Sequence, residues 1–126
     1  MARAFLFLNT LLFTGFGIFA FLNPAQMASM MGATDMSAAG FYELRSNYGG
    51  VSIGIGIACL FGGFRQGLAR PALYLLLAYT GGYALGRILA LPFDGIPPPN
   101  LIAYAIFEAV TASISGWLLL RTPQSK

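Results

Sequence analysis

Four long apolar segments decide what this chain can fold into. They cover approximately residues 4–22, 40–64, 71–91 and 101–120, and the first of them carries no charged residue. An α-helix rises about 1.5 Å per residue, so that about 20 apolar residues cross the hydrocarbon core of a bilayer, which is about 30 Å thick. Only 9% of the chain is charged, against about a quarter in soluble domains, and 57% is hydrophobic. The sequence therefore predicts an all-α, integral membrane four-helix bundle, with residues 1–126 forming a single membrane domain.

The first apolar segment has a competing interpretation as a secretory signal peptide. A signal peptide has an apolar region of about 7–15 residues, followed by a cleavage site made of small residues. The segment 4–22 is longer than that, and Asn23 and Pro24 end it without a clear site of this kind. We therefore expect an uncleaved first helix in a multi-pass membrane protein.

The connector of residues 24–40 is rich in Met, Ala, Gly and Ser. Met27, Met30 and Met31 are spaced as on one face of a short interfacial helix, but we favour a surface loop that dips into the lipid head groups. Short polar side chains cap a helix by accepting hydrogen bonds from its free N–H groups. The second long helix is therefore expected to be capped by Thr34, Asp35 or Ser37.

Prolines are expected to delimit the third long helix. Pro71 follows a basic turn at residues 65–70 and suits the first position of a helix, where a missing N–H does no harm. Pro92 is expected to stop the same helix, because the residue before a proline is pushed out of the helical region. The third helix is thus predicted over residues 71–91.

The residue types narrow the chemistry that this chain can support. There is no histidine, and the single cysteine, Cys59, lies in an apolar run. A haem or zinc site built on imidazole and an internal disulfide are therefore excluded. The isoelectric point of about 9.4 comes from a few scattered basic residues, so we expect no nucleic-acid partner. We identify no catalytic residues, no metal site and no cofactor, and we lean against an enzyme.

Basic residues predict how the chain lies in the membrane. Four spans place both termini and the turn at residues 65–70 on one side, while the opposite loops carry Asp35 and Asp94 without any Lys or Arg. Cytoplasmic segments of membrane proteins carry an excess of Lys and Arg. Both termini are therefore expected to be cytoplasmic, in a cell inner membrane. The basic residues on that side are Arg3, Arg65, Arg70, Arg121 and Lys126.

Four charged residues fall inside the predicted helices. In the predicted topology, Glu43, Arg45, Arg87 and Glu108 all lie in the outer half of the membrane. A charge inside a lipid-spanning helix costs at least a few kcal/mol, so it usually has a partner or a function. We expect one electroneutral cluster with a polar pocket around it. The candidate binding residues are Glu43, Arg45, Asn47, Tyr48, Tyr83, Arg87, Tyr104 and Glu108.

Two rows of small residues are candidates for helix packing. Within lipid, small side chains let helices approach closely, since packing replaces the hydrophobic effect as the driving force. One row can be used inside the bundle, which leaves the other for a partner. The first row is Gly50, Gly54, Ala58 and Gly62, and the second is Ala78, Gly82, Gly86 and Ala90.

Three blocks of the sequence resemble a known family. ELRSNYGGVSIGIGIACL resembles the lR-x-x-YGG-x-x-x-G-x-G signature of the family catalogued as domain of unknown function 4345, while GGYALGRILALPFDGIPPP and the segment from Tyr104 to Glu108 resemble its later blocks. The resemblance implies a small bacterial four-helix membrane protein without an assigned activity. The signature positions it implies are Arg45, Tyr48, Gly49, Gly50, Arg87, Asp94 and Glu108. The architecture is also similar to that of DoxX-like proteins, some of which accompany quinone-linked oxidoreductases, so an accessory subunit of a redox enzyme is a further interpretation.

Three roles for the charged residues remain open from the sequence. They can pair and fix the register of the helices, form a pocket for a lipid, small amphiphile or anion, or conduct protons or ions through Glu108. We expect a structural or accessory membrane protein, with binding or transport of a lipid or small amphiphile as the alternative. The expected partners are membrane lipid and either further copies of the chain or a larger membrane complex.

Overall fold

The computed structural model describes residues 1–33 and 35–122, and these residues form an all-α structure. Four of its helical segments are long and apolar enough to cross a membrane, as predicted: Ala2–Leu22, Ala38–Phe64, Gln66–Asp94 and Pro99–Arg121. The second of these is continuous but changes its winding along its length. In chain order the elements are α1 (Ala2–Leu22), α2 (Pro24–Met30), α3 (Ala38–Leu44), the π-helix η1 (Arg45–Gly50), α4 (Val51–Phe64), α5 (Gln66–Asp94) and α6 (Pro99–Arg121).

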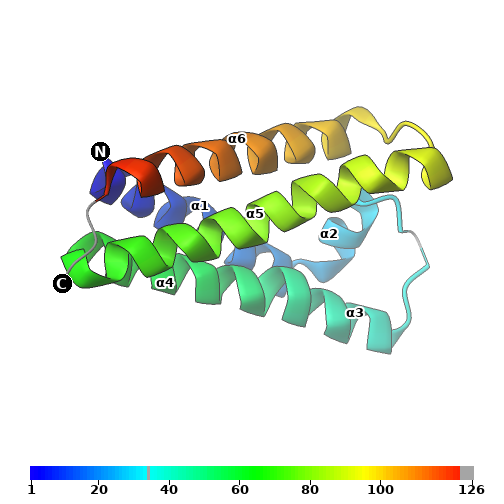
Figure 1. The fold of residues 1–126 in the computed structure, drawn as a ribbon. Helices are drawn as coiled ribbons and strands as arrows, with labels where there is room; N and C mark the ends of the chain where they lie inside the picture. The colour runs from blue at the N-terminus through cyan, green and yellow to red at the C-terminus, as the bar shows by residue number, and fades with distance from the viewer. Residues whose placement is uncertain (34, 123–126) are drawn as a thin grey trace.

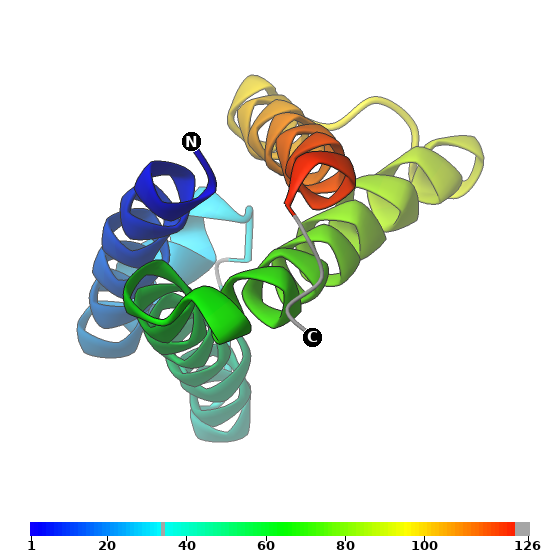
Figure 2. The same ribbon diagram turned by 60° about the vertical axis from the view of Figure 1, so that its left-hand side comes forward.

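The long helices form two packed pairs. α1 packs along α4, and α5 packs along α6. The two pairs meet at the end of the bundle where α1 begins and α6 ends, which we call the terminal end (Figure 1). The contact between the pairs is made by α4 and α5. At the same end Arg3 Nε donates a hydrogen bond to the Gly63 carbonyl at 2.8 Å within the first pair, and an Arg70 side-chain N–H donates to the Leu119 carbonyl at 2.9 Å within the second. Toward the opposite, far end, α5 diverges from α4 (Figures 1 and 2).

The hydrophobic core follows this divergence. The larger cluster of buried side chains draws on all four long helices, for example through Leu6, Cys59, Leu73 and Leu118. A smaller cluster at the far end is formed by α1, α2 and α3, through Ala20, Met27, Ala28 and Leu44. Among the described residues, neither α5 nor α6 contributes to the far-end core. Space therefore opens between the two helix pairs at the far end.

The connector after α1 is partly helical, so the expectation of a surface loop over residues 24–40 is wrong. Pro24 supplies the preset backbone angle of a first helical position, and α2 buries Met27 to 1% exposure and Ala28 to 2%. The burial of these side chains against α1 and α3 favours the helix. Ser37 caps α3, since its Oγ accepts a hydrogen bond from the Gly40 N–H at 3.2 Å. Of the other expected caps, Asp35 does not cap α3, and Thr34 lies outside the described residues.

Neither proline delimits α5, which is longer than predicted at both ends. Pro71 and Pro92 lie inside the helix, and the expected basic turn at residues 65–70 is reduced to Arg65. Each proline removes one backbone hydrogen bond of the helix. Both prolines lie within about two turns of a helix end, where the loss of one bond disturbs few others. The helix stops at Gly95, which has a φ of +76°, a conformation that glycine adopts at little cost.

Glycines bring α1 and α4 together, and most of the predicted row of small residues lies outside this contact. A methyl group added at Gly56 would lie 3.0 Å from the Thr14 backbone nitrogen, and one at Gly63 would lie 2.8 Å from the Phe7 ring. By contrast, a methyl group at Gly54 would meet nothing within 4 Å, and one at Gly50 only a carbonyl of its own helix. Of the predicted row, Gly62 is tightly packed, with a methyl group there 2.6 Å from the Ala72 side chain, and Ala58 is half-buried.

Candidate functional site

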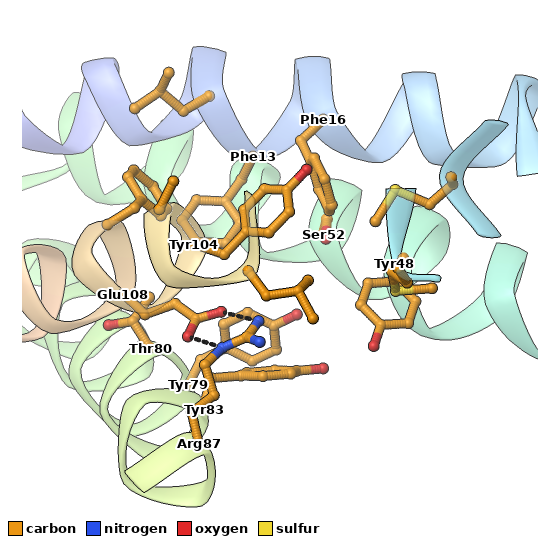
Figure 3. Close-up of a pocket in the computed structure, with 16 residues that line it drawn as sticks. Phe13, Phe16, Tyr48, Ser52, Tyr79, Thr80, Tyr83, Arg87, Tyr104 and Glu108 are labelled. Carbon is orange, nitrogen blue, oxygen red and sulfur yellow. Dashed lines mark hydrogen bonds and ion pairs between the residues drawn. The ribbon is translucent and has the colours of Figure 1, made fainter. Parts of the chain in front are cut away.

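A cavity of about 530 Å³ lies between the two helix pairs. Side chains from α1, α5, α6 and η1 point toward this space (Figure 3). Most of its lining is apolar or aromatic, and its two charged residues, Arg87 and Glu108, lie together on one side. We call it the interhelical cavity, and its lining residues are Leu12, Phe13, Phe16, Met27, Met31, Tyr48, Ser52, Tyr79, Thr80, Tyr83, Arg87, Leu101, Ala103, Tyr104, Phe107 and Glu108.

Aromatic rings hold the walls of the cavity apart. The Phe13 and Phe107 ring centroids are 6.2 Å apart, and those of Phe16 and Tyr104 are 6.3 Å apart, so that α1 and α6 face each other through rings. Tyr79 from α5 completes the set, at 5.9 Å from Phe13. Such edge-on and tilted ring pairs are the preferred geometry of aromatic side chains. The cavity is therefore held open by bulky side chains in ordinary contact.

One ion pair lies in the wall of the cavity. Arg87 Nε donates to Glu108 Oε2 at 2.6 Å, and Arg87 Nη2 donates to Glu108 Oε1 at 2.9 Å (Figure 3). This two-bond arrangement is the strong geometry for a guanidinium and a carboxylate. The side chains are 29% and 13% exposed, respectively. Arg87 lies about two turns from the far end of α5, and Glu108 lies between about two and three turns into α6.

The other predicted charges do not join this pair, so the expected cluster of four charges is wrong. Arg45 Nε donates to the Phe21 carbonyl at 3.1 Å, and Asn47 Nδ2 donates to Glu43 Oε2 at 3.1 Å. These residues belong to α3 and η1, which pack on the α1 side of the bundle. Because α5 diverges from that side, equal depth along the helices does not bring the charges together.

Three predicted tyrosines share the cavity with the ion pair. Tyr48, Tyr83 and Tyr104 line the interhelical cavity together with Arg87 and Glu108. They reach it from η1, α5 and α6, respectively, and Figure 3 shows Tyr83 beside Arg87. Of the eight candidate binding residues, these five share one site, and their role in binding stays a prediction. Glu43, Arg45 and Asn47 lie outside it.

Sequence reasoning missed several lining residues. Tyr79 packs edge-on against Tyr83, with ring centroids 5.0 Å apart. Its spacing of four from Tyr83, which is itself four from Arg87, was a usable signal, because residues four apart share a helix face. Ser52 and Thr80 are each 1% exposed and also line the cavity. No sequence pattern marks these small polar side chains as cavity-lining. Phe13 and Phe16 are not marked either, because α1 is apolar along its whole length.

A π-helix positions Tyr48. The segment RSNYGG forms η1, so the long helix is wound more widely for six residues before it returns to α geometry at Val51. Short π-helical insertions occur frequently at functional sites, because they shift side chains relative to the rest of the helix. The wider winding sets the direction of Tyr48 relative to α4, which no residue pattern predicted.

A second hollow lies on the neighbouring face of α5. It is lined by both small residues and rings, and we call it the α5 groove. A methyl group added at Gly82 or Gly86 would meet nothing within 4 Å, so this predicted packing row has no partner among the described residues. The groove shares four of its residues with the interhelical cavity, and these form the wall between the two. They are Tyr48, Tyr79, Tyr83 and Arg87.

The fold and site define a class of protein: a membrane-type four-helix protein with an ion pair in the wall of a partly open cavity between its helices. The family described as domain of unknown function (DUF4345) matches residues 1–119, and the chain belongs to this family. The resemblance drawn from the three sequence blocks is thereby confirmed. Neither the curated proteins nor the solved structures contain a match to this chain.

Proposed function

We propose that the protein binds a small amphiphile in the interhelical cavity. The observation that carries this proposal is the position of the Arg87–Glu108 pair in the wall of a cavity of about 530 Å³. Pockets for small molecules commonly measure about 300–1,000 Å³ and combine an apolar lining with a few placed polar groups. The cavity has this composition, with rings and aliphatic side chains on most sides and the ion pair on one.

A purely structural pair would be expected in different surroundings. A buried ion pair costs several kcal/mol in desolvation, which it recovers only when the neighbouring groups satisfy and enclose it. Here both charged side chains border open space, and Arg87 retains 29% exposure. This border gives a ligand direct access to the charged groups, while the pair still joins α5 to α6.

The proposed orientation places the cavity in the outer half of a cell inner membrane. It rests on the excess of Arg near the terminal end, since Arg3, Arg65, Arg70 and Arg121 all lie there. The cavity lies toward the far end, between α1 and α6. Leu12 and Ala103 in its wall are exposed to the surroundings, so an amphiphile in the outer leaflet has a lateral route into it.

Filling the cavity tests this proposal. Ala103 is exposed and lines the cavity, so Ala103→Trp is expected to place a large ring in it without overpacking the core. We expect native mass spectrometry of the protein in lipid nanodiscs to show an amphiphile retained by the unmodified chain and lost, at least tenfold, from the variant. Ile102→Trp is the matched control, because Ile102 is 39% exposed and lies outside the cavity. Equal retention by the two variants, or none by the unmodified chain, would contradict the proposal.

A second candidate function is that of an accessory subunit that assembles through the α5 groove. It is favoured by the open face at Gly82 and Gly86, because helices in lipid associate through such small-residue faces. If a helix of a second copy or of a larger complex occupies the groove, Gly82→Leu is expected to reduce the assembled fraction several-fold in native nanodiscs. Gly15→Leu, at an equally open glycine of α1, is expected to leave that fraction unchanged. A single-chain particle for all three proteins would rule out this function.

A further inference from the structure

The ion pair in the cavity wall determines which head groups the cavity can accept. Resting on the amphiphile binding proposed above, we infer that the cavity selects an amphiphile whose head group contains no charged group and accepts hydrogen bonds. Anionic and cationic amphiphiles with the same tail bind more weakly.

The charges of the cavity cancel. Among its lining residues, Arg87 supplies one positive charge and Glu108 one negative charge, and the two are joined by hydrogen bonds of 2.6 and 2.9 Å. A head group with a net charge would have to displace one partner of this pair or remain unpaired beside it. Either outcome leaves a charge without a counterion in surroundings of low dielectric constant, which is costly. A neutral head group avoids this cost.

The polar side of the cavity offers donors more than acceptors. Both carboxylate oxygens of Glu108 already accept hydrogen bonds from Arg87, which uses two of about four acceptor sites of this group. A guanidinium has five N–H donors, and these bonds use only two of them. The remaining edge of the Arg87 guanidinium faces away from Glu108, toward the side where Tyr79 and Tyr83 lie (Figure 3). Phenol hydroxyls can donate as well, so a carbonyl, ester or ring oxygen is the complementary group.

The rest of the cavity suits an apolar tail. Its lining also includes the aliphatic and thioether side chains of Leu12, Met27, Met31 and Leu101. Methionine side chains are flexible and adapt to irregular apolar shapes. The same cavity thus provides a neutral polar site and an apolar compartment within one volume of about 530 Å³.

A competition experiment with three probes of equal tail length tests this inference. The protein is placed in phosphatidylcholine nanodiscs with radiolabelled methyl laurate, and it is challenged with unlabelled methyl laurate, dodecyl sulfonate or dodecyltrimethylammonium. Binding to empty nanodiscs is subtracted. We expect the neutral ester to compete at least tenfold better than either charged probe. Better competition by the sulfonate or by the ammonium compound would overturn the inference.

Charge-changing variants test whether the net charge of the cavity determines the ranking of the three probes. Glu108→Gln leaves the cavity with one positive charge, so the sulfonate should gain about tenfold in competition. Arg87→Gln leaves one negative charge, so the ammonium probe should gain instead. Glu43→Gln removes a carboxylate that bonds Asn47 outside the cavity, and it should change neither ranking. If both cavity variants keep the ranking of the unmodified protein, the charge argument is wrong.

The outcomes separate this inference from the proposed function. If no probe binds the unmodified protein above the level of empty nanodiscs, amphiphile binding itself fails, and the head-group selection fails with it. If a probe binds but the ranking is anionic or cationic, amphiphile binding stands and only the neutral head group is overturned. Should a cavity variant fail to fold, the ranking of the three probes on the unmodified protein decides by itself.

Discussion

Replacing Glu108 by glutamine is expected to lower the free energy of unfolding by about 3 kcal/mol, and replacing Arg87 by glutamine should have an effect of similar size. The pair links α5 to α6 through bonds of 2.6 and 2.9 Å, and both bonds are part-buried. Either single change leaves the remaining charge without its partner. For a domain of this size the loss corresponds to a fall of about 10 °C in the midpoint of thermal unfolding in detergent.

The double variant, Arg87→Gln with Glu108→Gln, distinguishes pairing from independent effects. Because it removes both charges, it is expected to recover most of the stability that either single change loses, and the difference is the interaction energy of a double-mutant cycle. Glu43→Gln is the matched control for loss of a carboxylate. Glu43 is exposed and bonds only within its own turn, so its removal should change the stability by less than about 0.5 kcal/mol.

A different result would change the interpretation of the site. If both single variants unfold at the temperature of the unmodified protein, the pair contributes nothing to holding α5 against α6. Water or a ligand in the cavity would then stabilise each charge as well as its partner charge does. That outcome would contradict the stability prediction while leaving the cavity as the place where the charges act.

The sequence was sufficient to predict the four long helices and to place Arg87 and Glu108 at the same level of the bundle. Charge-free apolar runs specify membrane helices, and an antiparallel order of helices converts position along the chain into depth. The sequence left open whether Arg87 pairs with Glu108, Glu43 or a bound anion. The structure resolves this because α5 packs along α6, whereas η1 packs on α1, and α3 packs on η1 and α2. Which helices are neighbours depends on the shapes of whole faces, which single residues do not reveal.

Helix ends and the packing face of α4 were harder to predict for local reasons. Pro71 and Pro92 are strong signals for helix ends in isolation, yet in α5 each one costs only one hydrogen bond near an end. In α4, glycines are so frequent that several rows of small residues coexist. The spacing of four predicts one such row, whereas α1 packs against Gly49 of η1 and Gly56 and Gly63 of α4, which are seven apart. Spacing alone cannot say which row faces α1.

Gly56→Ala is therefore expected to destabilise the protein by about 2 kcal/mol, whereas Gly54→Ala should be neutral or stabilise it by less than about 1 kcal/mol. A methyl group at Gly56 would lie 3.0 Å from the Thr14 backbone nitrogen and 3.2 Å from the Thr10 carbonyl oxygen. Backbone atoms cannot rotate away as a flexible side chain can, so α1 has to move. A methyl group at Gly54 meets nothing within 4 Å and only gains the helix propensity of alanine.

The two positions are two residues apart on one helix, about half a turn, so their comparison isolates the packing face from the chemistry of the substitution. Thermal unfolding in the same detergent is the measurement, and Gly17→Ala provides an independent check from the α1 side. A methyl group there would lie 2.8 Å from the Gly49 carbonyl oxygen, so it should destabilise the protein as Gly56→Ala does. If Gly54→Ala were the damaging change instead, the predicted row would be the true interface, and α1 and α4 would pack through a different face. Because Tyr48 lies on the same continuous helix as α4, that rotation would also move its side chain relative to the cavity.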